Sequence, residues 1–402
     1  MYDVGFGDCF LLSFVYASGN PRRVLIDCGS RNAENKIPPV VDQLMTDLAD
    51  TEGHVDAVVI THRHLDHLSG FGDPQAAPKL ATLSPQLVLQ PWTEDPNLAH
   101  DAQDENGEHV QTLEAAQQYA QTVAADAKAA LPTASAADQQ MVAYLASLGI
   151  KNPAAVTLLS DLGDERKYLS FNQESGLGAL LPGVTVTVLG PPTLTESSDI
   201  KSESSTNSTQ FWQLQRGLMS AFTAPGGTGA GADPLFPNAK TEPLDDASPC
   251  LRWAIQNLNG IQDDNVERFV QCLDTAMNNT SLILLFEVGD KVLLFPGDAQ
   301  WENWHYGLQQ DGVKDRLANV DLYKVGHHGS CNATPMDLWN LFQRRNAAAG
   351  APKMTTLLPT ALGPFKTVPK DSLVTALTKE TDMIRSDQLG DGVLSYTAVV
   401  NI

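Results

Sequence analysis

A short strand-like run that ends in a cluster of histidines constrains this chain more than any other feature. Residues 57–67 read AVVITHRHLDH, so β-branched residues lead directly into three histidines and one aspartate. Imidazole and carboxylate are common metal ligands, and the end of a buried strand can hold them rigidly. Only nine histidines occur in the whole chain, so a chance cluster of surface histidines is the weaker interpretation. The sequence therefore predicts a metal site where a buried strand ends.

The pattern at 62–67 is the H-x-H-x-D-H motif, and with it the chain resembles the metallo-β-lactamase-fold hydrolase superfamily. Further motifs add to this resemblance: DVGFGD at 3–8, LIDCG at 25–29, LLFPGD at 293–298 and KVGHHGS at 324–330. Together with NNTSL at 278–282, they resemble a narrower branch of the superfamily. That branch is the hydrolase domain attached to the bacterial competence (DNA-uptake) channel protein, with its stand-alone relatives.

The resemblance implies the fold. We expect an α/β protein built as a four-layered α/β/β/α metallo-β-lactamase sandwich, with the metal cleft along one edge between two sheets. The chain would be a single domain, 1–402, with its core at about 1–94, 183–193 and 278–402. Apolar runs predict strands near 10–15, 24–26, 55–60, 87–89, 184–189, 281–288, 291–295 and 322–325. The segment at 357–361 resembles the last strands near the cleft.

Two segments interrupt the expected core. The first, at about 95–182, is predicted to be a helical insertion, because apolar residues recur at helical spacing between 113 and 130. Whether it covers the substrate as a lid or only adds bulk stays open. The second, at about 194–277, is a low-complexity loop that ends in a helix. Its Gly-rich run at 226–232 lacks the Lys-Ser/Thr ending of a phosphate-binding loop.

The resemblance also implies two sets of metal ligands. The sets are His62, His64 and Asp298 for the first ion, and Asp66, His67, His328 and the shared Asp298 for the second. Two divalent ions that share a carboxylate can share a water and lower its pKa toward neutrality, which makes hydroxide available as a nucleophile. Asp66 would also orient the hydroxide, and His327 would donate a proton or a hydrogen bond to the substrate. His328 is favoured over His327 as the ligand on resemblance alone.

One departure from the superfamily pattern concerns the first ion. Many members supply a further histidine from the middle of the chain, whereas VLGPP at 188–192 places Gly190 there. The first ion is therefore expected to have an open position and to be lost first on mild chelation. Two other residues have open roles. Asn278 is either a polar group near the site or the start of an Asx turn, and Lys366 is either an anion contact or, as we favour, a solvated loop lysine.

The composition limits the compartment and the class of partner. The 26 Lys and Arg residues against 48 Asp and Glu give a net charge of −22, so extended nucleic-acid binding is not expected. The five cysteines lack C-x-x-C spacing, which favours reduced thiols in the cytoplasm. No apolar run approaches about 20 residues, so no membrane span is expected. The sequence leaves the oligomeric state open.

Three functions from different classes fit these features. The leading hypothesis is a binuclear metallohydrolase that acts on a phosphodiester or phosphomonoester, such as a nucleotide or a phosphorylated small molecule. The alternatives are a carboxylic ester, lactone or amide hydrolase that uses the same hydroxide, and a non-catalytic metal-binding module. Nitrogen and carboxylate ligands suit both zinc and manganese, and zinc is favoured on its general frequency.

Overall fold

The computed structural model divides the chain into two compact units. Unit 1 comprises Met1–Pro96, Asn152–Ile200 and Met277–Ile402, and unit 2 comprises Asn97–Lys151 and Lys201–Ala276. The structure describes residues 1–17, 19–31, 36–101, 104–130, 132, 152–201, 273, 276–330, 332–346, 352–361 and 368–402. No helix among these residues is long and apolar enough to cross a membrane.

The first sheet of unit 1 has the strand order β1-β2-β3-β4-β5. Its strands are β1 (Cys9–Phe14), β2 (Arg22–Cys28), β3 (Ala57–Val59), β4 (Leu87–Pro91) and β5 (Glu165–Leu169). Strands β1 and β2 form an antiparallel hairpin, and β2 to β5 run parallel. The carboxyl ends of the parallel strands therefore lie at one edge of the sheet, where loops can carry functional side chains.

The second sheet has the strand order β11-β10-β9-β8-β7-β6. Its strands are β6 (Val184–Gly190), β7 (Ile283–Val288), β8 (Lys291–Phe295), β9 (Leu322–Lys324), β10 (Thr355–Leu358) and β11 (Asp382–Arg385). Strands β6, β7 and β8 are antiparallel neighbours, whereas β8 to β11 run parallel. Both sheets are thus mixed.

Side-chain alternation along the strands produces four layers. In β2, Val24 and Ile26 pack between the two sheets, whereas Leu25 packs on the outer face of the first sheet. In β7, Phe286 likewise packs between the sheets and Leu285 packs on the outer face of the second sheet. Because successive side chains of a strand point to opposite faces, each sheet buries apolar residues on both sides. Each outer face must therefore be covered by helices.

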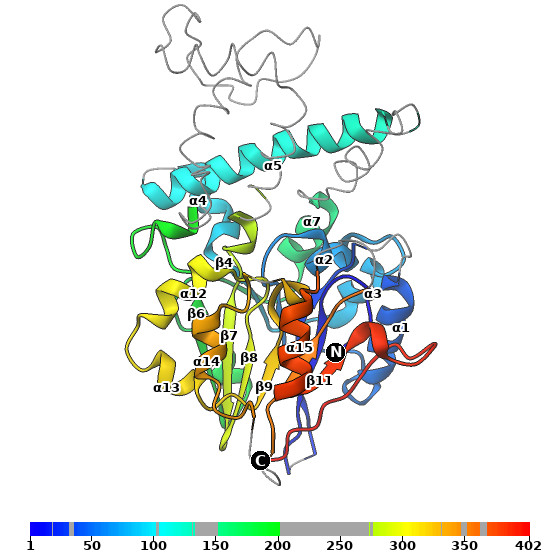
Figure 1. Ribbon diagram of the computed structural model, residues 1–402. Coiled ribbons are helices and arrows are strands. Elements are labelled where there is room, and N and C mark those ends of the chain that lie inside the picture. The colour runs from blue at the N-terminus through cyan, green and yellow to red at the C-terminus, as the bar shows by residue number, and fades with distance from the viewer. Residues whose placement is uncertain are drawn as a thin grey trace, which may run out of the picture. The chain divides into compact units, whose positions relative to one another are not determined.

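Helices of unit 1 cover both outer faces (Figure 1). The first sheet packs against α1 (Ile37–Asp47), α3 (Ala77–Leu80) and α7 (Pro153–Asp161). The second sheet packs against α12 (Trp301–Leu308), α13 (Val313–Leu317), α14 (Met336–Leu341) and α15 (Asp371–Glu380). The expected α/β/β/α sandwich is confirmed.

Among the described residues, the other helices are short, apart from one. They are α2 (Leu65–Leu68), α4 (Pro96–Asp101), α5 (Glu105–Ala130) and α8 (Leu177–Leu180). Single 3-10 turns lie at Ala49–Thr51, Ser69–Gly72, Ala81–Leu83, Trp92–Glu94, Asp199–Lys201, Gly326–Gly329 and Ser386–Gln388. The long helix α5 corresponds to the first helix expected in the insertion.

The two units can be set beside the segments expected from the sequence. Strand β5 pairs with β4 along its whole length and α7 packs on the first sheet, so residues 152–182 of the expected insertion at about 95–182 belong to unit 1. Unit 2 falls within the two segments expected to interrupt the core, and the single domain over 1–402 stays a prediction. Residues 133–151 of the insertion, most of the segment at 194–277 and Lys366 lie outside the described residues.

Candidate metal centre

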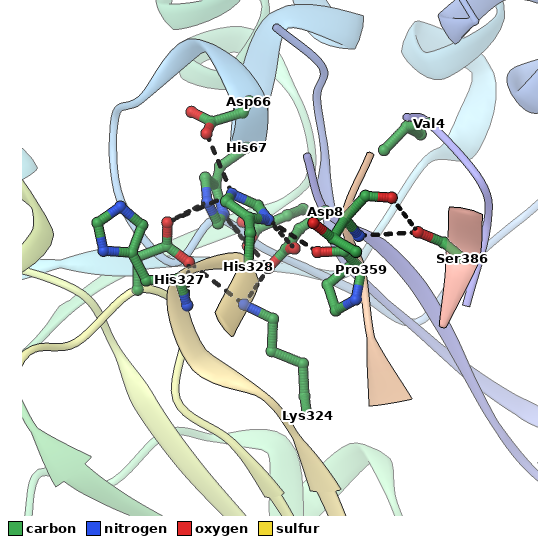
Figure 2. A network of polar contacts seen from close by, with 12 residues as sticks. Val4, Asp8, Asp66, His67, Lys324, His327, His328, Pro359 and Ser386 are labelled. Atoms are coloured by element: carbon green, nitrogen blue, oxygen red, sulfur yellow. Dashed lines mark hydrogen bonds and ion pairs between the residues drawn. The ribbon is translucent and has the colours of Figure 1, made fainter. Parts of the chain in front are cut away.

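The candidate metal centre collects residues from both sheets, at the carboxyl ends of three parallel strands. The H-x-H-x-D-H segment follows β3 and enters α2 at its last residues. Asp298 follows β8, and the two histidines of KVGHHGS follow β9. Figure 2 shows that the labelled side chains of Asp66, His67 and His328 converge in one polar network. The centre therefore spans the seam between the sheets.

Four of the expected ligands form one tight cluster. Asp66, His67, Asp298 and His328 each offer one ligand atom, and these atoms all lie within 4.8 Å of one another. His67 Nε2 lies 3.0 Å from Asp298 Oδ2, and His328 Nε2 lies 3.1 Å from Asp66 Oδ2. Each of these side chains is at most 4 % exposed. This is the ligand set expected for the second ion.

The donor atoms of this cluster fit a cation. His67 Nε2 and Asp298 Oδ2 are buried and face each other, yet neither has a hydrogen-bond partner among the described residues. Unsatisfied buried polar atoms are costly, and a shared cation would satisfy both. Two imidazole nitrogens and two carboxylates form a donor set suited to zinc or manganese. The residues present therefore fit a divalent ion.

The structure places His327 and His328 differently. Both have backbone φ angles in the left-handed region, 46° and 51°, between Gly326 and Gly329. This turn buries the ring of His328 in the cluster, where its Nδ1 lies 3.1 Å from the Pro359 carbonyl oxygen. The ring of His327 is only partly buried, and its backbone N–H donates to Asp298 Oδ1 at 3.1 Å. The turn thus brings His328 into the cluster of possible ligand atoms, whereas His327 is not part of it.

His62 and His64 form a separate pair. His62 Nε2 lies 2.9 Å from His64 Nδ1, and both side chains are buried. A pair of nitrogens this close can point at one ion, as expected for the first metal position. However, no group of three ligand atoms within mutual reach includes this pair in the part of the chain that the structure describes. The structure therefore does not bring Asp298 into a three-ligand set with His62 and His64.

Neighbouring charges keep both carboxylates of the cluster ionised. Burial alone would raise the pKa of Asp66, but Arg31 and His328 outweigh it and hold that pKa well below its ordinary value. Arg31 Nε lies 3.2 Å from Asp66 Oδ1. Burial likewise acts to raise the pKa of Asp298, but His67 and Lys324 outweigh it and lower that pKa. Both groups are therefore anionic at neutral pH.

The buried histidines are shifted in opposite directions. Burial acts to lower the pKa of His67 and of His328, but the nearby carboxylates, Asp298 foremost, outweigh it and raise both values. The pKa of His62 is lowered well below its ordinary value by burial and by the two neighbouring histidines. In the metal-free protein His62 is thus held neutral, whereas His67 and His328 favour the protonated form.

Three charged residues at the centre were not predicted from the sequence. Asp27 Oδ2 lies 2.8 Å from His67 Nδ1 and also accepts a hydrogen bond from the Thr61 hydroxyl at 2.7 Å, so it fixes the orientation of the His67 ring. Asp8 and Lys324 form a buried ion pair with an Oδ2–Nζ distance of 2.5 Å. The signal was present, because Asp8 and Asp27 belong to the DVGFGD and LIDCG motifs and Lys324 opens KVGHHGS.

Two glycines of these motifs let three backbone segments meet at the centre. A Cβ atom at Gly29 would lie 2.5 Å from backbone atoms of Asp66, His67 and Leu68. A Cβ at Gly7 would lie 2.2 Å from the Gly29 carbonyl oxygen. Side chains cannot occupy such spaces without moving the backbone. The glycines therefore allow the hairpin β1–β2 to approach α2, which carries Asp66 and His67.

The structure also locates the residues with open roles. A Cβ at Gly190 would lie 2.1 Å from Asn303 Oδ1, so the position where a further histidine could stand is filled by the Asn303 amide. Asn278 is fully buried, and its amide has no hydrogen-bond partner among the described residues, so its side chain does not form an Asx turn there. Lys366 lies outside the described residues.

Comparison with known proteins finds a match for part of the chain. No curated protein matches the chain. A family model matches residues 2–109, a region that includes the H-x-H-x-D-H segment, Asp8, Asp27 and Gly29, whereas Asp298 and His328 lie beyond it. The matching model is that of the Metallo-beta-lactamase superfamily.

Proposed function

We propose that the protein is a metal-dependent hydrolase that cleaves a phosphodiester or phosphomonoester. The observation that carries this proposal is the buried cluster of Asp66, His67, Asp298 and His328, whose ligand atoms lie within 4.8 Å of one another. A buried cluster with facing, unsatisfied donor atoms is expensive to build without a cation. The superfamily match over residues 2–109 supports hydrolysis as the reaction class.

We propose two ion positions in the centre. The four-residue cluster would hold one divalent ion, and the His62–His64 pair would hold the other, with zinc as the favoured metal. When bound, the ions would supply Lewis-acid polarisation of the substrate and a nucleophile at neutral pH. The protein's share is to fix these ligands in a buried setting where electrostatic interactions are strong.

His327 is the residue we assign to proton transfer. Its ring is partly buried and stands next to the centre, while its backbone N–H is tied to Asp298 Oδ1 at 3.1 Å. An imidazole held at this position can donate a proton to the leaving-group oxygen. Asp66 faces His328 on one side and Arg31 on the other, so the orientation of its carboxylate is fixed. The role that we propose for this carboxylate is to orient the attacking hydroxide.

The substrate class is proposed from resemblance and charge. The motifs DVGFGD, NNTSL and KVGHHGS support the competence-type branch, where a phosphoester substrate is the natural expectation. A net charge of −22 disfavours extended nucleic acid, because such a partner requires a basic face. A nucleotide or a phosphorylated small molecule is therefore the substrate that we propose.

Turnover of three model substrates tests this proposal. The protein is reconstituted with Zn²⁺ or Mn²⁺ and assayed with bis-p-nitrophenyl phosphate, p-nitrophenyl acetate and nitrocefin. We expect metal-dependent turnover of the phosphodiester that His67→Ala abolishes and that the exposed-site control His54→Ala preserves. Turnover of the acetate alone would indicate a carboxylic ester hydrolase. A fully metallated protein that turns over none of them would indicate a metal-binding module.

A further inference from the structure

Lys324 is a buried lysine to which neither ligand set assigns a role. It ends β9, where Leu322 faces the second sheet's inner side and Tyr323 its outer side, so alternation returns Lys324 to the space between the sheets. Its side chain is 1 % exposed. A buried ammonium costs several kcal/mol unless it is fully paired, so the fold must provide partners.

The partners of Lys324 connect it to a metal ligand. Its Nζ lies 2.5 Å from Asp8 Oδ2, 2.8 Å from the Gly297 carbonyl oxygen and 3.3 Å from Asp298 Oδ1. Figure 2 shows the Lys324 side chain reaching up to the network that contains Asp8 and His328. These three acceptors match the three donors of an ammonium group. The lysine is therefore held in place by contacts that also include Asp298.

The two oxygens of Asp298 consequently have different partners. Oδ1 accepts from Lys324 Nζ and from the His327 backbone N–H. Oδ2 faces the cluster, at 3.0 Å from His67 Nε2 and 3.6 Å from His328 Nε2. A carboxylate oxygen held by two donors is poorly placed to bind an ion, so Asp298 offers Oδ2 as its ligand oxygen to the cluster. Among the described residues, no group of three ligand atoms joins Asp298 to the His62–His64 pair.

The ligands at the centre favour one ion position over the other. The cluster offers two carboxylates and two imidazoles whose ligand atoms lie within 4.8 Å of one another. Among the described residues, the second position has only the imidazoles of His62 and His64, so it lacks a carboxylate that would balance a buried divalent charge.

We propose that Lys324 is a positioning residue that fixes Asp298 as a one-oxygen ligand and makes the two ion positions unequal. The Asp66–His67–Asp298–His328 position binds its ion tightly, and the His62–His64 position binds weakly. This inference rests on the proposed function, because it describes the affinity of the same centre. The contact between Lys324 and Asp298 is the proposed cause of the difference in affinity between the two ion positions.

Titration of the metal-free full-length protein with Zn²⁺, against a chromophoric chelator, tests the inference. We expect the wild type to bind one ion tightly and a second one at least about 10-fold more weakly, as expected where second-shell groups tune affinity. Lys324→Met keeps the side-chain bulk but removes the charge. It should weaken the first ion about 10- to 100-fold and strengthen the second, so that the two affinities converge.

Two further variants complete the experiment. Lys291→Met removes a lysine of the neighbouring strand β8 whose Nζ pairs with Asp290 at 2.9 Å, and it should leave both affinities unchanged. Asp8→Asn leaves Asp298 as the one carboxylate within 4.0 Å of Lys324 Nζ among the described residues, and it should weaken the first ion without strengthening the second. If Lys324→Met fails to fold, Asp8→Asn decides the matter.

The outcomes separate this inference from the proposed function. A wild type that binds no Zn²⁺ overturns both. A wild type that binds two ions with equal affinity, or a folded Lys324→Met with the wild-type difference between them, overturns the role of Lys324 alone. Wild-type affinities in Asp8→Asn overturn it as well.

Discussion

Asp298 is the residue on which the centre depends most, because it contacts both histidines of the cluster as well as Lys324. We expect Asp298→Ala to lose bound metal and activity together.

His327→Ala, in contrast, should keep a near-normal metal content while turnover falls by about 100-fold or more, as expected for a positioned acid–base group. Elemental analysis and turnover of bis-p-nitrophenyl phosphate measure the two effects. If His327→Ala loses metal and His328→Ala does not, the roles of the two histidines are exchanged.

The raised pKa values of His67 and His328 predict that metal binding releases protons. Both imidazoles favour the protonated form in the metal-free protein, and a ligand histidine must be neutral. Near neutral pH, binding of one ion should release up to about two protons, and affinity should rise with pH. Calorimetry in buffers of different ionisation enthalpy counts these protons.

The same shifts fix the sign of the pH effect on the metal-free protein. Because the folded-state pKa values are raised, the two histidines stabilise the metal-free fold below about pH 6.5. That contribution is lost as pH rises through the raised pKa values.

Two variants test the number of protons released on metal binding. His328→Ala should lower this number by about one, whereas His62→Ala should not change it, because burial already keeps His62 neutral. If metal binding near neutral pH released no protons, His67 and His328 would not be ligands that are protonated in the metal-free protein.

At the residue level, the sequence predicts the ligands better than it predicts the residues that hold the ligands in place. The ligands stand in a motif whose spacing is visible, and the structure brings Asp66, His67, Asp298 and His328 together. Asp27 and Lys324 are single polar residues at the ends of apolar runs, so their sequence context does not reveal a partner. Their partners lie 40 and 316 positions away, at His67 and Asp8. Only the fold brings such pairs together.

At the level of elements, the close approach of β2 and α2 depends on Gly29. Gly29→Ala would place a Cβ 2.5 Å from the backbone of Asp66, His67 and Leu68, so α2 must shift. We expect the free energy of unfolding to fall by about 1–3 kcal/mol, the usual cost of overpacking, and metal affinity to fall with it. Denaturant unfolding of the chelated protein and Zn²⁺ titration measure the two effects.

Gly178→Ala is the matched control for this change. Gly178 lies in the short helix α8, and its added Cβ would meet nothing nearer than the Val184 carbonyl oxygen at 3.8 Å. Alanine is favoured over glycine in helices, so stability should stay the same or rise slightly. An equal loss of stability in both variants would show that the approach of β2 to α2 is not what Gly29 provides.

The strands that the sequence did not predict share a physical feature. Strands β5 and β11 lie at the edges of their sheets, and most of their residues are only partly buried or exposed. Edge strands carry polar side chains such as those of ERKYL at 165–169, which show no apolar alternation. The central strands β2, β3, β4 and β7 are apolar on both faces and were predicted. The edge strands β1 and β6 were also predicted, because their sequences CFLLSF and VTVTVLG are rich in apolar and β-branched residues. An apolar or β-branched run therefore made a strand visible in the sequence, and β5 lacks one.

At the level of the whole molecule, the centre joins the two sheets of unit 1. Asp66 and His67 follow β3 in the first sheet, whereas Asp298 and His328 follow β8 and β9 in the second. An ion bound by all four would cross-link the sheets at their common edge. Because a ligand that binds only the folded state stabilises it, about 2.7 kcal/mol would be gained at a concentration 100 times the Kd.

Hydrogen exchange with and without chelator tests this cross-link. Chelation should reduce protection at 61–68, which follow β3 of the first sheet, and at 297–298 and 326–329, which follow β8 and β9 of the second, because both sides lose the same bound ion. Protection of α1, which packs on the outer face of the first sheet, should change little. Asp298→Ala should show no response to chelator. Loss of protection on one side only would mean that the ion is held by one sheet, so the seam between the sheets is then held by apolar packing alone.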